Sequence, residues 1–190
     1  MRIPIAVTIT LAASFSLLAC SPQEDAPPPL PFALTQDAMG RYCGMNVLEH
    51  PGPKGHVILE HIPEAIWFSS ARDTLAFTML PEEPRDIAAI YVSDMSNAET
   101  WEEPGAENWV DAREALFVID SSRRGGMGTE EAVPFSQEED AKAFAQEYGG
   151  RIVRFADIPQ DYILGSGTSM PEAAPGSTGE TEVTDGHHHG

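Results

Sequence analysis

The sequence is poor in cysteine and in basic residues, and both shortages exclude classes of function. Its 190 residues include two Cys, at positions 20 and 43, which cannot build a disulfide framework or a four-Cys zinc site. Lys and Arg number 11 against 30 Asp and Glu, which gives a formal net charge of -19. Nucleic-acid binding and electrostatic adhesion to anionic lipid both need clustered positive side chains, so we exclude both. The hydrophobic fraction of 42% is ordinary for a folded domain.

Long apolar runs are also scarce, and one stands at the N-terminus. Residues 3–18 are apolar and follow Arg2, but the run is short for a membrane span. It ends in Leu17-Leu18-Ala19-Cys20, which resembles a bacterial lipobox, with Leu three positions and Ala one position before the Cys. We therefore predict a lipoprotein signal peptide over 1–19 and lipidation of Cys20, which anchors the chain to a membrane facing the periplasm. An ordinary signal peptide with a chance Cys is the alternative.

Both ends of the mature chain have the composition of segments that lie outside a folded domain. Residues 20–31 are rich in proline, with five Pro in the last eleven positions, and predict an extended, semi-rigid linker. Ser21, rather than Asp, follows the predicted anchor, which favours the outer membrane over the inner one. Residues 165–190 lack aromatic side chains and end in a His triplet at 187–189, so we expect a disordered tail. The folded domain is predicted over 32–164.

A weak internal repeat divides this domain. Residues 65–77 and 132–144 share six of thirteen identities, all at an offset of 67 positions. In each copy a serine, Ser69 or Ser136, is the candidate N-cap of a helix, and Ser136 with Glu139 has the spacing of a capping box. Helices are predicted over 70–79 and 137–148. Chance similarity between two helix starts is the alternative to duplication.

Short apolar runs rich in β-branched residues flank both predicted helices. They occupy 56–61 and 87–92 around the first helix, and 115–120 and 151–155 around the second. Such runs, bounded by turn residues, predict strands. The expected fold class is α+β, with two small ββαβ-like units, over about 41–95 and 109–158, packed as one domain.

The chemistry that the sequence offers lies in sulfur ligands. Once Cys20 is lipidated, Cys43 is the one remaining thiol, in a compartment where an unpaired thiol is a liability. Met45 is two residues further on, so both side chains share a face if the segment is a strand. A turn at Gly44 brings the two sulfurs together equally well. Thiolate and thioether are soft donors that suit Cu(I) among physiological metals. A buried, inert cysteine remains the alternative.

A second exposed thioether is expected in the glycine-rich segment 125–128. Met127 stands between glycines, which is not typical of a helix or a packed strand, so it is a poor candidate for core packing. If the repeat is real, duplication can place the two sulfur loops on one edge of the domain. Further candidate ligands are His50, in a turn-dense loop after Met45, and Met95, at a strand end. The tail triplet can hold Cu(II), Ni(II) or Zn(II) weakly.

Two other functions are compatible with the same residues. The first is a thiol-dependent periplasmic enzyme that uses Cys43, with His50, His56 or His61 as its base. The second is a lipoprotein that binds a partner without metal, through its acidic surface and the tryptophans at 101 and 109.

Several of these segments together resemble the NosL family. They are Tyr42-Cys43-Gly44-Met45, residues 50–55, residues 109–113, and Gly125-Gly126-Met127-Gly128 ahead of residues 132–136. The resemblance extends over about 32–164 and includes the lipobox. It implies a pair of ββαβ units similar to part of the organomercurial lyase, and a Cu(I) chaperone rather than an enzyme. It also implies that Cys43, Met45 and Met127 are the copper ligands. The implied partners are nitrous-oxide reductase, whose copper centre is the recipient, and the associated ABC-transporter and assembly proteins.

Overall fold

A computed structural model describes residues 27–165. The predicted signal peptide, the lipidation site at Cys20 and the His triplet of the tail lie outside the described residues. Within 27–165, no helix is long and apolar enough to cross a membrane.

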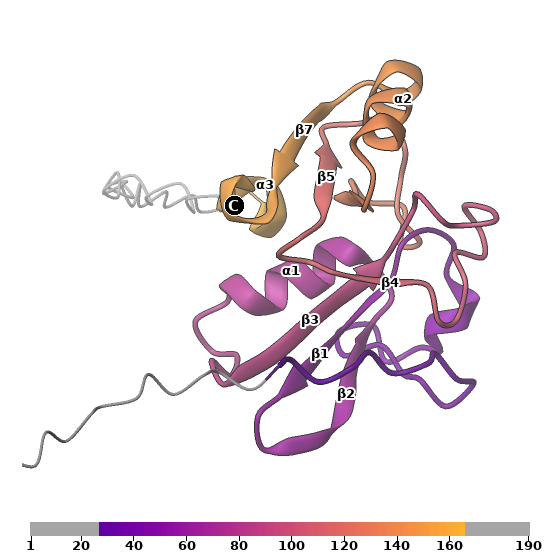
Figure 1. The fold of residues 1–190 in the computed structure, drawn as a ribbon. Helices are drawn as coiled ribbons and strands as arrows, with labels where there is room; N and C mark the ends of the chain where they lie inside the picture. The colour runs from indigo at the N-terminus through magenta and orange to yellow at the C-terminus, as the bar shows by residue number, and fades with distance from the viewer. Residues whose placement is uncertain (1–26, 166–190) are drawn as a thin grey trace, which may run out of the picture.

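The first unit is an antiparallel sheet with one helix (Figure 1). Its elements are β1 (Gly55–Leu59), β2 (Ile62–Phe68), α1 (Ala71–Met79) and β3 (Ile87–Ser93). A short later strand, β4 (Trp109–Asp111), pairs with β3 and completes the strand order β2-β1-β3-β4. The described chain therefore begins its sheet with the ββαβ pattern that was predicted.

The second unit repeats these connections. Its elements are β5 (Leu116–Ile119), β6 (Val133–Phe135), α2 (Glu138–Tyr148) and β7 (Arg151–Arg154), in the strand order β6-β5-β7. The chain then passes through a 3-10 turn (Phe155–Asp157) into α3 (Gln160–Leu164). In both units the first strand is central and antiparallel to both neighbours. The predicted α+β fold with two ββαβ units is confirmed, and the shared topology supports duplication.

The predicted helix starts were displaced by one residue. Ser70, not Ser69, caps α1, because its Oγ accepts a hydrogen bond from the backbone N–H of Asp73 at 3.0 Å. The capping box predicted at Ser136 is wrong: Gln137 occupies the N-cap position of α2, with no side-chain capping bond. Ser136 instead donates its backbone N–H to Asp94 Oδ1 at 2.9 Å. Ser136 thus lies before the N-cap position, and its backbone N–H bonds to Asp94 instead of joining the first helical turn.

The second strand of each unit was not predicted from the sequence, and the reason is physical. β2 and β6 are edge strands, and each contains a proline, which removes a backbone donor but is tolerated at an edge. The residues at 60 and 61, predicted to end a strand, form the turn between β1 and β2. Strands with one unpaired edge need no continuous apolar run, so their pattern in the sequence is weak.

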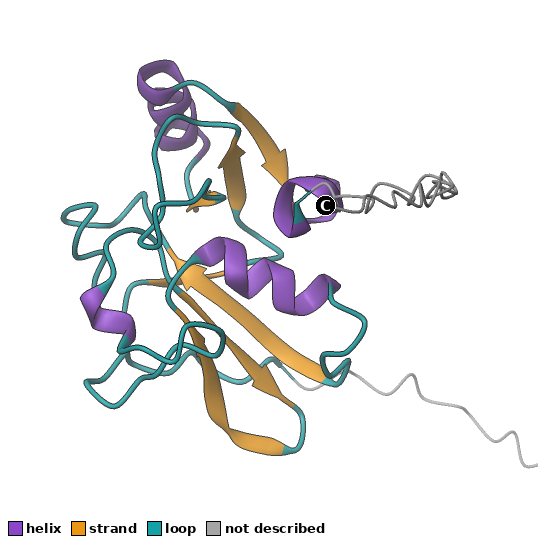
Figure 2. Cartoon of the chain, turned by 180° about the vertical axis from the view of Figure 1, so that it is seen from behind, coloured by secondary structure: helices purple, strands orange, loops and turns teal. Residues whose placement is uncertain are grey.

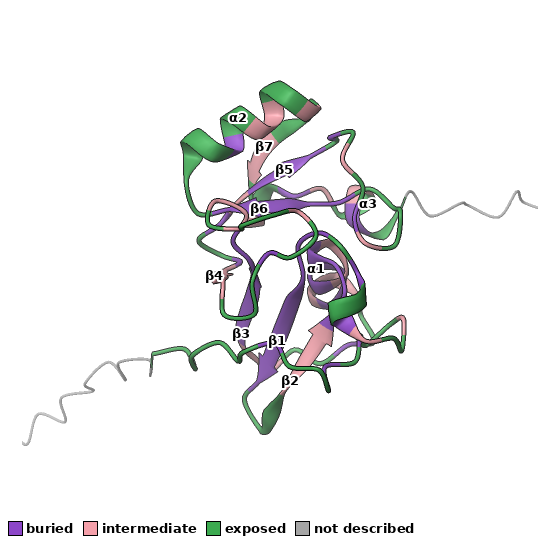
Figure 3. Cartoon of the chain, turned by 90° about the vertical axis from the view of Figure 1, so that its right-hand side faces the viewer, coloured by how far each residue is buried: buried purple, intermediate pink, exposed green. Residues whose placement is uncertain are grey.

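The core consists of alternating layers of sheet and helix, with α1 in the middle (Figure 3). Val57 and Val92 of the first sheet, Phe77 of α1 and Phe117 of β5 belong to one buried cluster. Val118, the next residue of β5, points the opposite way and belongs to a second cluster. That cluster also contains Val133, Phe135 and Ala141 of α2. The period of two along β5 thus lets one strand contact both helices.

The outer face of the first sheet is covered by the segment that enters the domain. His56 of β1 is fully buried there, between the rings of Trp67 and Trp109 at centroid distances of 4.6 and 4.7 Å. Its Nε2 accepts a hydrogen bond from the backbone N–H of Phe32 at 3.2 Å. Tyr91 donates its hydroxyl to the carbonyl of Pro29 at 2.7 Å. The entering segment is therefore fixed to the sheet. Burial lowers the pKa of His56 to about 4, so the imidazole is neutral at physiological pH.

Candidate metal centre

Long loops gather on one side of the molecule, beside the ends of the strands (Figure 2). The loop that carries Cys43 is a closed turn over 40–45. Its ends are joined by two backbone hydrogen bonds, from Gly40 N–H to the Met45 carbonyl at 2.9 Å and from Gly44 N–H to the Gly40 carbonyl at 2.8 Å. Gly44 has a φ of +64°, a conformation that glycine adopts without strain. Of the two geometries that the sequence left open, the turn is the observed one.

The turn is attached to the first unit through the two residues that precede the thiol. Arg41 donates its backbone N–H to the carbonyl of Trp67 at 2.7 Å, near the end of β2. The Arg41 guanidinium lies 3.3 Å from the carboxylate of Glu83, and the Tyr42 hydroxyl donates to the same carboxylate at 3.2 Å. Burial and the nearby Glu83 charge raise the pKa of Tyr42, which keeps its hydroxyl protonated. The base of the turn is thus held while its tip faces solvent.

The thiol itself is half-buried and lies close to a serine. Cys43 Sγ is 3.4 Å from Ser69 Oγ, at the start of the segment that leads into α1. Gly40 leaves room for the thiol in this orientation, because a Cβ at position 40 would lie 2.5 Å from that sulfur. The Met45 side chain, 40% exposed, emerges from the same turn. Met39 is also exposed, and its backbone forms an isolated β-bridge with Asn46 across the turn.

Met127 lies at the tip of a second tight turn. Gly125 and Gly128 are joined by a hydrogen bond from the Gly128 N–H to the Gly125 carbonyl at 2.8 Å. A second bond runs from the Gly125 N–H to the Thr129 carbonyl at 2.9 Å. The Met127 side chain is 44% exposed. The prediction of an exposed thioether, rather than one that fills the core, agrees with this position.

The Met127 turn meets the first unit through Gly126. A Cβ at Gly126 would lie 2.7 Å from both the Cβ of His50 and the carbonyl oxygen of Pro51. His50 follows the short 3-10 helix (Val47–Glu49) that begins two residues after Met45. The second unit's turn therefore packs against the segment that leaves the first unit's turn. Only a glycine at 126 permits this approach.

His50 has the features of an additional candidate metal ligand. Its side chain is buried beside Gly126, and its Nε2 has no hydrogen-bond partner among the described residues. Its carbonyl accepts a hydrogen bond from Lys54 Nζ at 2.6 Å, and the Gly52 carbonyl accepts another at 3.0 Å. Burial lowers the pKa of Lys54 to about 8. The ammonium thereby fixes the loop between the two turns.

A buried carboxyl group joins the base of the Met127 turn to α1. Glu131 Oε1 accepts the backbone N–H of Arg72 at 2.8 Å, in the first turn of α1, and that of Ala132 at 2.9 Å. Its Oε2 has no partner within 27–165, and burial raises the pKa of Glu131 to about 8. The Arg72 side chain donates to the carbonyls of Tyr162 and Ile163 at 2.7 and 3.0 Å. This network ties the second unit's turn, α1 and α3 together.

The remaining candidates lie elsewhere. Met95 packs against the cluster that contains Val118 and Phe135, and its backbone N–H bonds to Pro134. His56 is enclosed on the outer face of the first sheet, and His61 occupies the β1–β2 turn at the far end of β2. The repeat does not place the two sulfur loops at equivalent positions, so the expectation that was based on duplication was wrong. Met127 lies between β5 and β6, whereas Cys43 and Met45 precede β1, so the two sulfur loops are not equivalent in the duplication.

Sequence reasoning missed Gly40, Ser69 as a neighbour of the thiol, and Glu131. Each acts through a contact between segments far apart in the chain, and no local pattern marks such contacts. Within 27–165, no group of three or more His, Cys, Asp or Glu side chains is arranged to hold a metal.

Comparison with known proteins decides the family. The NosL family model matches residues 31–163. The chain belongs to the NosL family. This confirms the resemblance read from the sequence motifs. The match covers both ββαβ units and both sulfur-bearing turns of the NosL domain.

Characterised relatives of this NosL chain are similar over most of their length. A protein of Achromobacter cycloclastes described as a copper-binding lipoprotein NosL is 43% identical over 157 residues, which are 82% of this chain and 81% of the relative. A protein of Stutzerimonas stutzeri with the same description is 33% identical over 160 residues, 84% of this chain and 82% of the relative. The crystal structure of the copper chaperone NosL from Shewanella denitrificans is 37% identical and superposes with a TM-score of 0.66. It covers 70% of this chain and 98% of its own.

Proposed function

We propose that this protein binds Cu(I) between its two sulfur-bearing turns and passes it to another protein. Cys43 and Met45 supply the first unit's ligands, and Met127 supplies the ligand of the second unit. The observation that carries the proposal is the close packing of Gly126 on His50 and Pro51, which brings the Met127 turn against the segment that follows the Cys43 turn. The descriptions of the relatives as copper-binding lipoproteins support the choice of metal.

The donor chemistry favours Cu(I) over harder metals. A thiolate with two thioethers is a soft ligand set, and Cu(I) prefers such sets. Binding requires loss of the thiol proton, and the Ser69 hydroxyl, 3.4 Å from Sγ, can donate to the resulting thiolate. His50, with its unpartnered Nε2, is available as a further ligand when the loop rearranges.

Exposure of the ligands suits a carrier. Met45 and Met127 lie at turn tips while the bases of both turns are fixed by hydrogen bonds. An incoming ligand from a recipient can therefore displace one thioether at a time, without unfolding of the site. Deeply buried ligands would hold the metal but slow its release.

The finer parts of the proposal concern place and partner. We propose that Cys20 carries the lipid anchor and that the domain faces the periplasm, with the outer membrane slightly favoured. The proposed recipient is nitrous-oxide reductase, whose copper centre is assembled with help from an associated ABC transporter and assembly proteins. The family and the lipoprotein descriptions of the relatives support this assignment.

The thiol-enzyme alternative gains no support from His56 or His61. His56 is enclosed by aromatic rings, and its Nε2 is occupied by the Phe32 N–H. His61 lies at the opposite end of β2 from the thiol. The group recorded beside Cys43 Sγ is the hydroxyl of Ser69, which is a poor base.

A competition titration with bicinchoninate tests the proposal. The full chain, with the three tail histidines replaced by alanine to remove their contribution, should bind one Cu(I). Cys43→Ser should abolish tight binding, and Met127→Ala should weaken it about tenfold, or about 1.4 kcal/mol. Met95→Ala is the matched control, because Met95 packs in a separate cluster. Unchanged affinity in both Cys43→Ser and Met127→Ala would remove the proposed site.

A further inference from the structure

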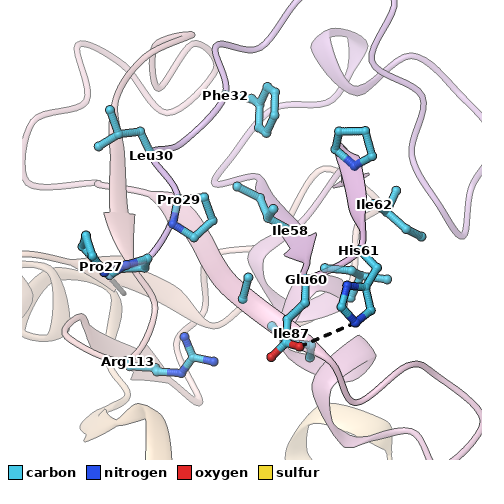
Figure 4. Close-up of a pocket in the computed structure, with 14 residues that line it drawn as sticks. Pro27, Pro29, Leu30, Phe32, Ile58, Glu60, His61, Ile62, Ile87 and Arg113 are labelled. Atoms are coloured by element: carbon cyan, nitrogen blue, oxygen red, sulfur yellow. Dashed lines mark ion pairs between the residues drawn. The ribbon is translucent and has the colours of Figure 1, made fainter. Parts of the chain in front are cut away.

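The far end of the first sheet carries a hollow, lined in part by apolar side chains, that the copper proposal does not use (Figure 4). The hollow has a volume of about 990 Å³. It lies between the entering segment and the β1–β2 turn. Its lining includes Pro27, Leu30, Phe32, Ile58, Ile62 and Ile87.

Apolar side chains around this hollow are unusually exposed. Leu30 is 84% exposed, and Phe32 and Ile62 are 40% and 43% exposed. The backbone that carries Leu30 and Phe32 is fixed to the sheet, because the Phe32 N–H is bonded to His56 and the Pro29 carbonyl accepts from Tyr91. A fixed backbone that presents apolar side chains to solvent is typical of a contact surface.

The length of the chain before this surface indicates what covers it. Pro27 lies seven positions after Cys20, the predicted lipid anchor. Seven extended residues span at most about 25 Å, at about 3.6 Å per residue. A domain tethered this closely meets the bilayer at a high effective concentration, so even a weak apolar contact is populated.

We propose that the surface formed by Leu30, Phe32 and Ile62 rests on the lipid bilayer beside the anchor. This inference depends on the anchoring of Cys20 and does not depend on copper binding. The polar groups around the hollow are few and mixed in sign: Glu60, His61 and Arg113. The contact is therefore apolar, and it needs no anionic lipid.

Such a contact orients the metal centre. β2 runs from Ile62 at the bilayer contact to Phe68, and Ser69, the next residue, touches Cys43. A strand of this length spans about 20 Å. The sulfur-bearing turns are thus held at the end of the sheet that points away from the membrane, where a periplasmic partner can reach them.

Tryptophan quenching in vesicles tests the contact. The full-length acylated chain is reconstituted in phosphatidylcholine vesicles whose acyl chains carry bromine, which quenches nearby indoles. Leu30→Trp should gain at least twofold more quenching than the matched variant Leu48→Trp. Leu48 is also an exposed apolar residue, but it follows Met45 at the opposite end of the sheet. The unsubstituted chain supplies the background of the native tryptophans.

Other results would overturn the proposal. Equal quenching in Leu30→Trp and Leu48→Trp would mean that the domain has no fixed orientation. Quenching that appears only when anionic lipid is added would mean that the contact is electrostatic. A dimer of the unacylated Cys20→Ser chain that Ile62→Glu dissociates, without quenching in the acylated chain, would assign the surface to a second copy.

Two further measurements keep this test separate from the copper proposal. Mass spectrometry of the N-terminal peptide establishes acylation before the vesicles are made. Cu(I) titration of the same vesicles should give the same affinity for Leu30→Trp as for the unsubstituted chain. Loss of quenching with intact copper binding would therefore count against the bilayer contact alone.

Discussion

The two ββαβ units share their connections but differ in what surrounds their helices. α1 lies between the two sheets, and five of its nine residues are buried. α2 lies on the outside of the second sheet, and Ala141 is its one buried residue. Both helices come from equivalent positions of the repeat. The local sequences differ in the same direction, because the buried Leu75 of α1 corresponds to Lys142 of α2 at the repeat offset.

The units also differ in their first connection. In the first unit, β1 and β2 are joined by the turn at 60 and 61. In the second, the corresponding connection runs from 120 to 132. It contains the Met127 turn and Glu131, and its Glu130 carbonyl accepts a hydrogen bond from the Arg72 side chain. Loops tolerate such insertion because they do not disturb the sheets that they join. The two proposed sulfur-bearing turns thus lie in segments that the repeat does not equate.

The largest expected effect compares a phenylalanine that occurs in both copies. Phe77 of α1 and Phe144 of α2 occupy equivalent positions, but Phe77 is fully buried and Phe144 is partly exposed. Phe77→Ala should lower the free energy of unfolding by about 3–5 kcal/mol, through lost burial and a residual cavity. Phe144→Ala should lower it by less than half as much. Urea unfolding followed by circular dichroism measures both, and equal losses would contradict the assigned layer order.

The second prediction concerns the carboxyl group that joins the units. Glu131 has a pKa raised to about 8 by burial, so the folded state keeps a proton that the unfolded chain loses near pH 4.5. The contribution of Glu131 to the free energy of unfolding is fully present below pH 4.5 and is lost as the pH rises towards 8. Between pH 5 and 8, the unfolding free energy of the apo protein should fall by about 3.5 kcal/mol more than that of Glu131→Gln.

Comparison with the variant also removes the effects of other buried groups. His56 acts in the opposite direction, because its pKa of about 4 makes stability rise with pH up to its unfolded value of 6.5. Lys54, whose pKa is about 8, contributes mainly above that pH. Both groups are retained in Glu131→Gln. Parallel pH profiles for the two proteins would show that the folded-state pKa of Glu131 is not raised.

A third prediction separates the two turns without removing a ligand. Gly126→Ala places a Cβ against His50 and Pro51 and should push the Met127 turn away from the first unit. We expect Cu(I) affinity to fall about tenfold, or about 1.4 kcal/mol, in a chelator competition. Thr129→Ala, an exposed change in the same loop, is the control. If Gly126→Ala binds as tightly as the control, Met127 does not need this approach.

The smallest expected effect compares two serines at equivalent positions of the repeat. Ser69 contacts the thiol, whereas its repeat equivalent Ser136 has no sulfur recorded beside it among the described contacts. Ser69→Ala should weaken Cu(I) binding about threefold, or about 0.6 kcal/mol, by removing a hydrogen bond to the thiolate. Ser136→Ala should leave the affinity unchanged. The same chelator titration measures both, and equal affinities would show that the hydroxyl does not support the metal-bound thiolate.

The fold was predictable where its cause is local. Phe77 and Phe144 mark two helices that recur with the same spacing, and runs such as 56–61 and 87–92 gave central strands close to their observed positions. The helix caps were displaced because Ser69 and Ser136 lie before the N-cap positions, where tertiary contacts use them. β6 was unplaced because it is a short edge strand that contains Pro134.

The candidate site was predictable in its chemistry and not in its geometry. The softness of Cys43 and Met45, and the isolation of Met127 between glycines, follow from residue type and neighbours. Their common location depends on Gly126 against His50, a contact between positions 76 residues apart in the sequence. No local sequence pattern indicated that Glu131 is buried, because its burial results from the packing of both units. The assignment of all three sulfurs to one metal stays a prediction.

The glycine beneath the thiol has a consequence for the history of the family. A side chain at position 40 would displace Cys43 Sγ from its observed position, because its Cβ would lie 2.5 Å from that sulfur. Selection on the thiol therefore acts on position 40 as well. Among descendants of the same ancestor, Gly40 should be free to drift only in lineages that have already lost the cysteine, so substitutions at 40 should date that loss.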